Sequence, residues 1–356
     1  MSTSAHFSEP LNGPQPEAGR LLGAALREGP AHAYLFHGPA GVGKRATARA
    51  FAKELLGTER NVHPDLYELE PLGEMIRIDA IRELRRDLHM RPFEADRRVY
   101  LLHRAHLMNE DAADALLKDL EEPPSYAVVV LIADDLGPIS ETIRSRCQLV
   151  PFRRLAERAI RELAEARAPD MPEERRAALA RVAGGRLDRL ERLLDPRSAA
   201  RRDVLIAQAR AVYRDPGFAA SGGAAALIAA ARERADEARA LEEANVEAME
   251  LPAREAEQRV KRAASGAERE ELLAQLDELA AWYRDLVAVA VGAEGAAMHL
   301  DKLDELRDDA SRERITGAER ACEHIRDTWR GLEELNLNPQ LAFESLFVRI
   351  GREVAS

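Results

Sequence analysis

The strongest constraint on the fold is the glycine-rich string Gly38-Pro-Ala-Gly-Val-Gly-Lys44. It matches the phosphate-loop pattern G-x-x-x-x-G-K-[ST] up to the lysine, but the next residue is Arg45. An apolar segment at 34–36 precedes the string and a helical pattern at 46–56 follows it, which is the strand–loop–helix setting that such a loop requires. Glycines let backbone N–H groups surround phosphate oxygens, and the lysine adds a point charge. The predicted nucleotide-binding residues are therefore Gly38, Gly41, Gly43 and Lys44.

Two features needed for hydrolysis are missing. The hydroxyl that normally follows the lysine helps to hold Mg²⁺, and Arg45 cannot supply it. Such ATPases also place acidic residues at the end of a later strand, but the strand expected at 99–102 runs into His103 and Arg104. The sequence predicts a degenerate phosphate loop, in which ATP binding stays an open alternative. His103 and His106 are expected to be polar surface, because no third metal ligand lies near them in sequence.

The pattern of apolar residues separates two kinds of architecture. Short strands alternate with helices up to about residue 152, which predicts an α/β fold with a doubly wound parallel sheet. Beyond it only helical periodicity is seen, with breaks at Pro169, Pro172 and Gly184-Gly185. We predict a phosphate-loop domain at 1–153, a small helical lid at 154–198 and an all-helical domain at 199–356.

Within the helical domain, the segment 232–271 is heavily charged and has few large apolar side chains. It is expected to form long solvated helices, either as plain exposed helices or as an arm. An apolar stripe from Leu272 to Leu286 with four-three spacing must pack on something. Ser221-Gly222-Gly223 is expected to be a turn between helices.

Composition excludes several classes of protein and of binding site. A formal net charge of −11 excludes a general polyanion binder, and two cysteines cannot form a four-cysteine zinc site or a disulfide framework. This cysteine usage favours a reducing cytoplasm. The segment 1–13 shows no signal-peptide pattern, and no apolar run is long enough to span a membrane, so no membrane association is expected.

Several strings together resemble the clamp-loader branch of the AAA+ ATPases, and within it the delta-prime subunits of bacterial DNA polymerase III. The most specific are Ala115-Leu-Leu-Lys-Asp-Leu-Glu-Glu-Pro-Pro124 and Glu141-Thr-Ile-Arg-Ser-Arg-Cys147. The resemblance is strong over 10–155, weak to about 200 and thin beyond that, except near the C-terminus. The supporting strings are His32-Ala-Tyr-Leu-Phe36, His63-Pro-Asp65 and Asn336-Leu-Asn-Pro-Gln-Leu341.

The resemblance implies an AAA+ domain followed by a helical lid and a helical collar. Motor subunits of the family carry Asp-Glu where this chain has His103-Arg104, and Thr or Ser at position 45, whereas the Ser-Arg-Cys string is intact. That combination implies a stator without ATPase or polymerase activity, which supplies Arg146 as an arginine finger to the site of a neighbouring subunit. Arg144 would orient it or contact the same interface.

The implied partners are the gamma/tau and delta subunits, the sliding clamp, and primed DNA through the complex. Most relatives insert a four-cysteine zinc module before the His-Pro-Asp string. This chain instead passes through Gly57-Thr-Glu-Arg-Asn-Val62 without a cysteine, so no zinc and no required cofactor are expected.

Three alternatives stay open at this point. The first is an active ATPase motor subunit of the same clamp loader, which would need replacements for the metal ligands lost at 45, 103 and 104. The second is an unrelated phosphate-loop enzyme such as a small-molecule kinase, against which the two specific strings argue. The third is a helical adaptor unconnected with replication.

Overall fold

The structure is a computed structural model that describes residues 13–60, 63–71, 75–247, 253–335 and 337–354. It divides into two compact units: one reaches Ile160 and includes Gly185–Asp188, and the other holds Arg161–Gly184 and the residues from Arg189 onward. This two-unit division does not follow the expected lid boundaries, because 161–184 groups with the C-terminal helices. The three-domain division at 153 and 198 stays a prediction.

The first unit is built on a parallel five-stranded sheet with the order β2-β3-β4-β1-β5. Strand β1 (Ala33–His37) pairs with β4 (Ala127–Ala133) on one side and with β5 (Gln148–Pro151) on the other. On the far side of β4, strand β3 (Arg98–Leu102) pairs with both β4 and β2 (Leu66–Leu69). The expected doubly wound parallel sheet is confirmed.

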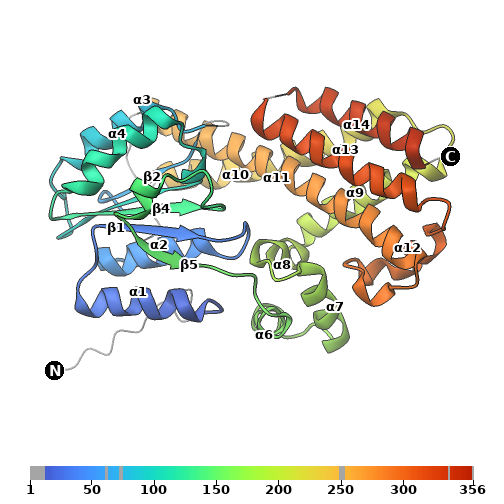
Figure 1. Cartoon of the computed structure of the whole chain (residues 1–356), viewed down its shortest axis with the longest axis horizontal. Coiled ribbons are helices and arrows are strands. Elements are labelled where there is room, and N and C mark those ends of the chain that lie inside the picture. The colour runs from blue at the N-terminus through green and yellow to red at the C-terminus, as the bar shows by residue number, and fades with distance from the viewer. Residues whose placement is uncertain (1–12, 61–62, 72–74, 248–252, 336, 355–356) are drawn as a thin grey trace. The chain divides into compact units, whose positions relative to one another are not determined.

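Helices cover both faces of this sheet (Figure 1). On one face lie α1 (Pro16–Glu28) and α2 (Lys44–Leu56), where the Phe51 ring meets the Tyr34 ring edge-on at 5.1 Å. On the other lie α3 (Ile78–Leu88), the 3₁₀ turn η1 (Ala105–Leu107), α4 (Glu110–Glu121) and α5 (Glu141–Arg144). Every residue of β4 is buried, which explains why its sequence is a continuous apolar run without alternation.

Of the next three helices, two include residues of both units and one lies wholly within the second unit. The former two, α6 (Glu157–Arg167) and α8 (Leu187–Leu194), flank α7 (Glu173–Ala183) in the chain. The sequence breaks at Pro169, Pro172 and Gly184-Gly185 fall between these helices, as predicted.

The remaining helices form the core of the second unit. Its members are α9 (Pro196–Arg214), α10 (Ala220–Glu247), α11 (Ala253–Ala290), α12 (Leu303–Asp309), α13 (Ile315–Glu334) and α14 (Pro339–Val354), with short 3₁₀ turns η2 (Glu294–Ala296) and η3 (Leu300–Lys302). The predicted apolar stripe is confirmed as core, because Leu272, Leu276, Leu279, Tyr283 and Leu286 are all buried. The buried Trp282 donates its Nε1–H to the Tyr213 hydroxyl at 3.1 Å, which satisfies the indole in the apolar core.

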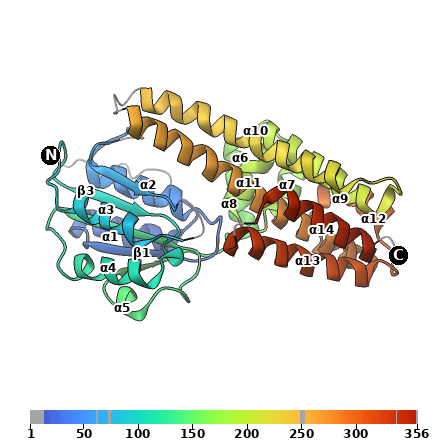
Figure 2. The same ribbon diagram turned by 90° about the horizontal axis from the view of Figure 1, so that it is seen from above.

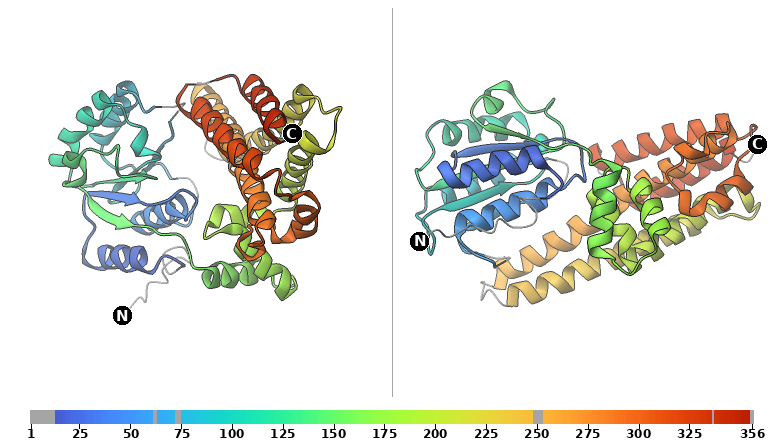
Figure 3. Two further views of the ribbon diagram at one scale, coloured as in Figure 1. Left: turned by 45° about the vertical axis from the view of Figure 1, so that its right-hand side comes forward. Right: turned by 90° about the horizontal axis from the view of Figure 1, so that it is seen from below.

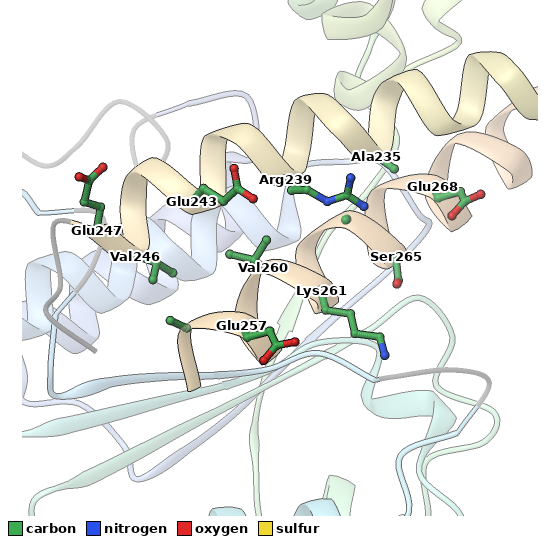
Figure 4. Close-up of a pocket in the computed structure, with 12 residues that line it drawn as sticks. Ala235, Arg239, Glu243, Val246, Glu247, Glu257, Val260, Lys261, Ser265 and Glu268 are labelled. Atoms are coloured by element: carbon green, nitrogen blue, oxygen red, sulfur yellow. The ribbon is translucent and has the colours of Figure 1, made fainter. Parts of the chain in front are cut away.

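The charged segment 232–271 is helical wherever it is described, as predicted, and residues 248–252 lie outside the described part. Within the second unit α10 and α11 lie side by side, and their paired ends project past the ends of α13 and α14 (Figures 2 and 3). Charged and small apolar side chains alternate around a cavity of about 610 Å³ between the two helices (Figure 4). Small side chains such as Ala235, Ala256 and Ala264 line it, so the two helices can approach closely without bulky apolar residues.

One expected turn is wrong. Ser221-Gly222-Gly223 lies in the first turn of α10, not between helices. The physical reason is packing: a Cβ at Gly223 would lie 2.6 Å from Cζ of Phe218, so glycine is needed there to admit the aromatic ring.

Among the described residues, no helix is both long enough and apolar enough to cross a bilayer.

Candidate phosphate loop and arginine corner

The glycine-rich string forms the loop between β1 and α2. Gly38, Gly41 and Gly43 all have positive φ. A Cβ at Gly38 would lie 2.0 Å from the carbonyl oxygen of Phe152, and one at Gly41 would lie 2.1 Å from Oδ1 of Asp188. Both the backbone conformation and the space therefore require glycine at these two positions.

Lys44 is buried at the start of α2 and has all three ammonium protons engaged. Its Nζ donates to the carbonyl oxygens of Gly38 and Pro39, each at 2.6 Å, and lies 2.7 Å from Oδ1 of Asp134. Burial lowers the pKa of Lys44, although the Asp134 carboxylate opposes this shift. The lysine predicted to bind phosphate is thus held by its own loop and by a carboxylate.

A second carboxylate lies against the loop at Gly41. The backbone N–H groups of Leu187 and Asp188 both donate to the Gly41 carbonyl, at 2.7 and 3.2 Å. The Asp188 side chain points at the Gly41 Cα and accepts from the Arg186 guanidinium at 2.8 and 3.1 Å. Acidic groups of this chain therefore occupy the surroundings of the loop, where phosphate would bring further negative charge.

The two positions that lack hydrolytic residues, Arg45 and His103, each contact an acid on or just after β2. Arg45 forms an ion pair with Glu70, and His103 lies with its Nε2 2.9 Å from Oε2 of Glu68. Arg49 binds the same Glu68 carboxylate with both Nε and Nη2 at 2.9–3.1 Å. The expectation that His103 is surface is wrong: it is 3% exposed, because Glu68 gives the imidazole a buried partner.

Electrostatics make Glu68 a stable anion in this network. Burial alone would raise the pKa of Glu68, but the hydrogen bond from His103 and the charge of Arg49 outweigh it and lower the pKa to about 2. One ligand atom each from Glu68, Glu70 and His103 lies within 4.8 Å of the others, a set that could hold a metal ion. In the described structure both carboxylates instead face arginines, so this position already carries positive charge.

The Ser-Arg-Cys string forms a corner between α5 and β5. Ser140 caps α5 by accepting from the Ile143 N–H at 3.4 Å, and Arg144 ends the helix half-buried. The Arg146 guanidinium binds Glu121, and its Nη1 donates to the Thr142 carbonyl at 2.8 Å.

Cys147 completes the corner as a packing residue. Burial raises the pKa of its thiol to about 12, so the thiol stays protonated near neutral pH.

The structure brings the predicted loop residues Gly38, Gly41, Gly43 and Lys44 together, whereas Arg146 lies apart on another loop of the same unit. Sequence reasoning missed four acids around the loop: Glu68, Glu70, Asp134 and Asp188. A usable signal existed for Asp134, which directly follows an apolar strand, because ligands in such folds collect at the carboxyl ends of strands. Glu68 lies in β2 and Glu70 directly follows that strand, and neither gave a sequence signal of its own.

The sequence strings behind the family resemblance also have structural roles. The carboxylate of Asp65, in the His63-Pro-Asp65 string, accepts backbone N–H bonds from Phe93, Glu94 and Ala95 at 2.7–2.9 Å, which fixes the loop before β3. Asn336 of the last string lies outside the described residues, and Pro339 begins α14.

Residues 15–156 match the family model described as "DNA polymerase III, delta subunit". The DNA polymerase III subunit delta' of Pseudomonas aeruginosa is 38% identical over 176 residues, which cover 44% of this chain and 53% of that protein. This part of the chain is similar to the delta-prime subunits of DNA polymerase III. The subunit delta' of Bacillus subtilis is 33% identical over 169 residues, with 43% of this chain and 51% of that protein covered.

A tau subunit of DNA polymerase III is also similar to part of this chain. The DNA polymerase III subunit tau of Bacillus subtilis is 33% identical over 156 residues, with 39% of this chain and 28% of that protein covered. The chain thus spans about half the length of the two delta' relatives and less of tau. Because delta' and tau subunits are both similar to this chain, the distinction between subunit roles depends on the site residues.

Proposed function

We propose that this chain is a non-hydrolysing subunit of a DNA polymerase III clamp loader, which supplies Arg146 to the ATP site of a neighbouring motor subunit. Its partners would be the gamma/tau and delta subunits, and through the assembly the sliding clamp and primed DNA in the cytoplasm. The observation that carries the proposal is the pair of replaced positions at the phosphate loop. Arg45 and His103 stand where a magnesium-dependent ATPase needs oxygen ligands, and both are engaged by Glu70 and Glu68.

The loop geometry supports the same role. Lys44 is bound by two loop carbonyls and by Asp134, and Asp188 lies against Gly41. A triphosphate would have to displace one carboxylate and approach another, without a hydroxyl to order the metal. We infer that the loop is a structural element in this chain, and that no bound nucleotide or zinc is required.

The proposal is tested in the complex assembled from this chain and its own motor and delta subunits. Arg146→Ala is expected to slow ATP turnover at the adjacent site by roughly a thousandfold, the effect of removing an arginine finger. Arg153→Ala is the matched control, since the Arg153 side chain is largely exposed and pairs with Glu17 at 3.5 Å. Unchanged turnover in the Arg146→Ala assembly would overturn the proposal.

One observation favours a second candidate, an active motor subunit. Glu68, Glu70 and His103 form a group with metal-ligating capacity beside the loop. Magnesium-dependent ATP hydrolysis by the purified chain, lost in Lys44→Ala, would favour this candidate. Absence of hydrolysis by the chain alone, together with the Arg146→Ala defect in the complex, would exclude it.

A further inference from the structure

The Arg146 guanidinium is folded back onto its own unit. Its Nη2 binds a carboxylate oxygen of Glu121, and its Nη1 donates to the Thr142 carbonyl at 2.8 Å and to the Ser145 hydroxyl at 3.3 Å. The Arg146 side chain is 31% exposed in this position. The terminal nitrogens that would meet a phosphate are both in use.

The partner carboxylate comes from the other specific string of the sequence. Glu121 is the last residue of α4, and Pro123-Pro124 follow it and prevent the helix from continuing. Its side chain is 48% exposed and reaches across to the corner after α5. The Leu-Glu-Glu-Pro-Pro string and the Ser-Arg-Cys string therefore meet through one ion pair.

A carboxylate and a phosphate present similar oxygens to a guanidinium and compete for the same donors. Nη1 already donates to two acceptors and Nη2 to Glu121, so Arg146 cannot bind a phosphate on another subunit through both terminal nitrogens until these contacts break. We propose that Glu121 is a positioning residue that stores Arg146 in a withdrawn state, and that the arginine engages the neighbour's nucleotide by exchanging this carboxylate for phosphate. The inference rests on the proposed arginine-finger function.

The exchange sets the size of the expected effect. Exposed ion pairs are weak, so the Arg146–Glu121 pair favours the withdrawn state of Arg146 only modestly. Removing the Glu121 carboxylate should therefore raise the population of unpaired Arg146 by about two- to fivefold. Salt screens such a pair. The advantage of removing Glu121 therefore shrinks as ionic strength rises, which a purely structural role for Glu121 does not predict.

The experiment compares assembled complexes carrying Glu121→Gln, Arg146→Ala or both, with Glu122→Gln as the control. Glu122 is the adjacent exposed acid of the same string. ATP turnover at the adjacent site is expected to rise about two- to fivefold in Glu121→Gln at low salt and to approach the wild-type rate at high salt. Glu122→Gln is expected to match wild type. In the Arg146→Ala background the Glu121→Gln change is expected to have no effect, because the two residues act as a pair.

The outcomes separate the two levels of the proposal. If Arg146→Ala is silent, the arginine-finger function itself fails. If Arg146→Ala is strongly defective but Glu121→Gln leaves turnover unchanged or lowers it, the function stands and the storage role of Glu121 is wrong. A gain that persists in the Arg146→Ala background would also overturn the storage role, since it would show that Glu121 acts through another group. Thermal unfolding of each variant checks that the fold is retained.

Discussion

The Nζ of Lys44 lies 2.7 Å from the Oδ1 of Asp134. This contact joins the residue after the glycine-rich loop to the residue after β4, at the position where a phosphate would otherwise accept the lysine protons. The loop thereby satisfies its own buried cation.

Replacing this carboxylate should open the loop to nucleotide. Asp134→Asn removes a negative charge beside Lys44, so the affinity for ATP is expected to increase on the order of tenfold, about 1.4 kcal/mol of relieved repulsion. Isothermal titration of the purified chain with ATP measures the change. Asp135→Asn, at the neighbouring acid that caps the Gly137 N–H, is the control and should leave affinity unaltered. Equal affinities of wild type and Asp134→Asn would contradict this account of the loop.

The Glu68 network should make the fold sensitive to acid. The folded-state pKa of Glu68 is lowered to about 2 from 4.5, so its stabilising contribution is present above pH 4.5 and is lost as pH falls toward 2. The contribution is on the order of 3 kcal/mol. Urea unfolding at several pH values should show that the free energy of unfolding falls less steeply below pH 4.5 for Glu68→Gln than for wild type. Glu83→Gln, at an exposed glutamate of α3, should retain the wild-type slope.

His299 should give the opposite pH dependence in the second unit. Its Nδ1 lies 2.7 Å from Oδ2 of Asp285 and its Nε2 3.0 Å from Oε1 of Glu278. Burial would lower the pKa of His299, but its hydrogen bonds to Asp285 and Glu278 outweigh burial and raise the pKa. The stabilisation is complete below pH 6.5 and is lost as pH rises through the raised folded-state pKa.

Chemical denaturation between pH 6 and 9 checks the His299 prediction. Wild type is expected to lose stability toward alkaline pH, and His299→Gln is expected to be less stable at pH 6 with a flatter profile. His324→Gln is the control, because His324 lies 3.9 Å from Glu353 and is partly exposed. Parallel profiles for wild type and His299→Gln would show that the imidazole is not charged in the fold.

The glycine-rich loop offers a test of packing that is independent of charge. Gly38→Ala would place a methyl group 2.0 Å from the Phe152 carbonyl oxygen, and the backbone must shift to admit it. The free energy of unfolding is expected to fall by more than about 3 kcal/mol. Gly57 also has a positive φ, of 62° against 138° at Gly38, but no atom lies within 4 Å of its added Cβ, so Gly57→Ala should cost only about 1 kcal/mol. Similar losses in the two variants would rule out close packing as the reason for Gly38.

The sequence predicts those features that depend on local pattern. The spacing of Ile81, Leu84 and Leu88 predicts α3 at its observed bounds, and the unbroken apolar run predicts β4. The glycines and the lysine of the loop are predicted together because their fixed spacing, between a strand and a helix, is typical of a phosphate loop. The contacts of His103 were not predicted, since its partner Glu68 lies 35 residues away on a neighbouring strand.

Distance along the chain also accounts for the other residues that the sequence did not reveal. Asp188 reaches the loop from a helix far along the chain, and no local pattern shows which acid will do so. The Ser221-Gly222-Gly223 turn was misplaced because paired glycines usually break helices, whereas here Phe218 needs the space beside Gly223. Tertiary packing decided each of these cases.

The pairing of β1 with β5 ties the two functional loops to one rigid support. His37 lies beside Pro151 in the sheet, Gly38 touches the Phe152 carbonyl, and Arg146 stands just before β5 begins. In a subunit that takes up and releases nucleotide, movement of the loop would be transmitted along this strand to the arginine. Here Lys44 is already bound by two loop carbonyls and by Asp134, so we expect the proposed finger Arg146 to be presented from a support that does not move with a nucleotide cycle.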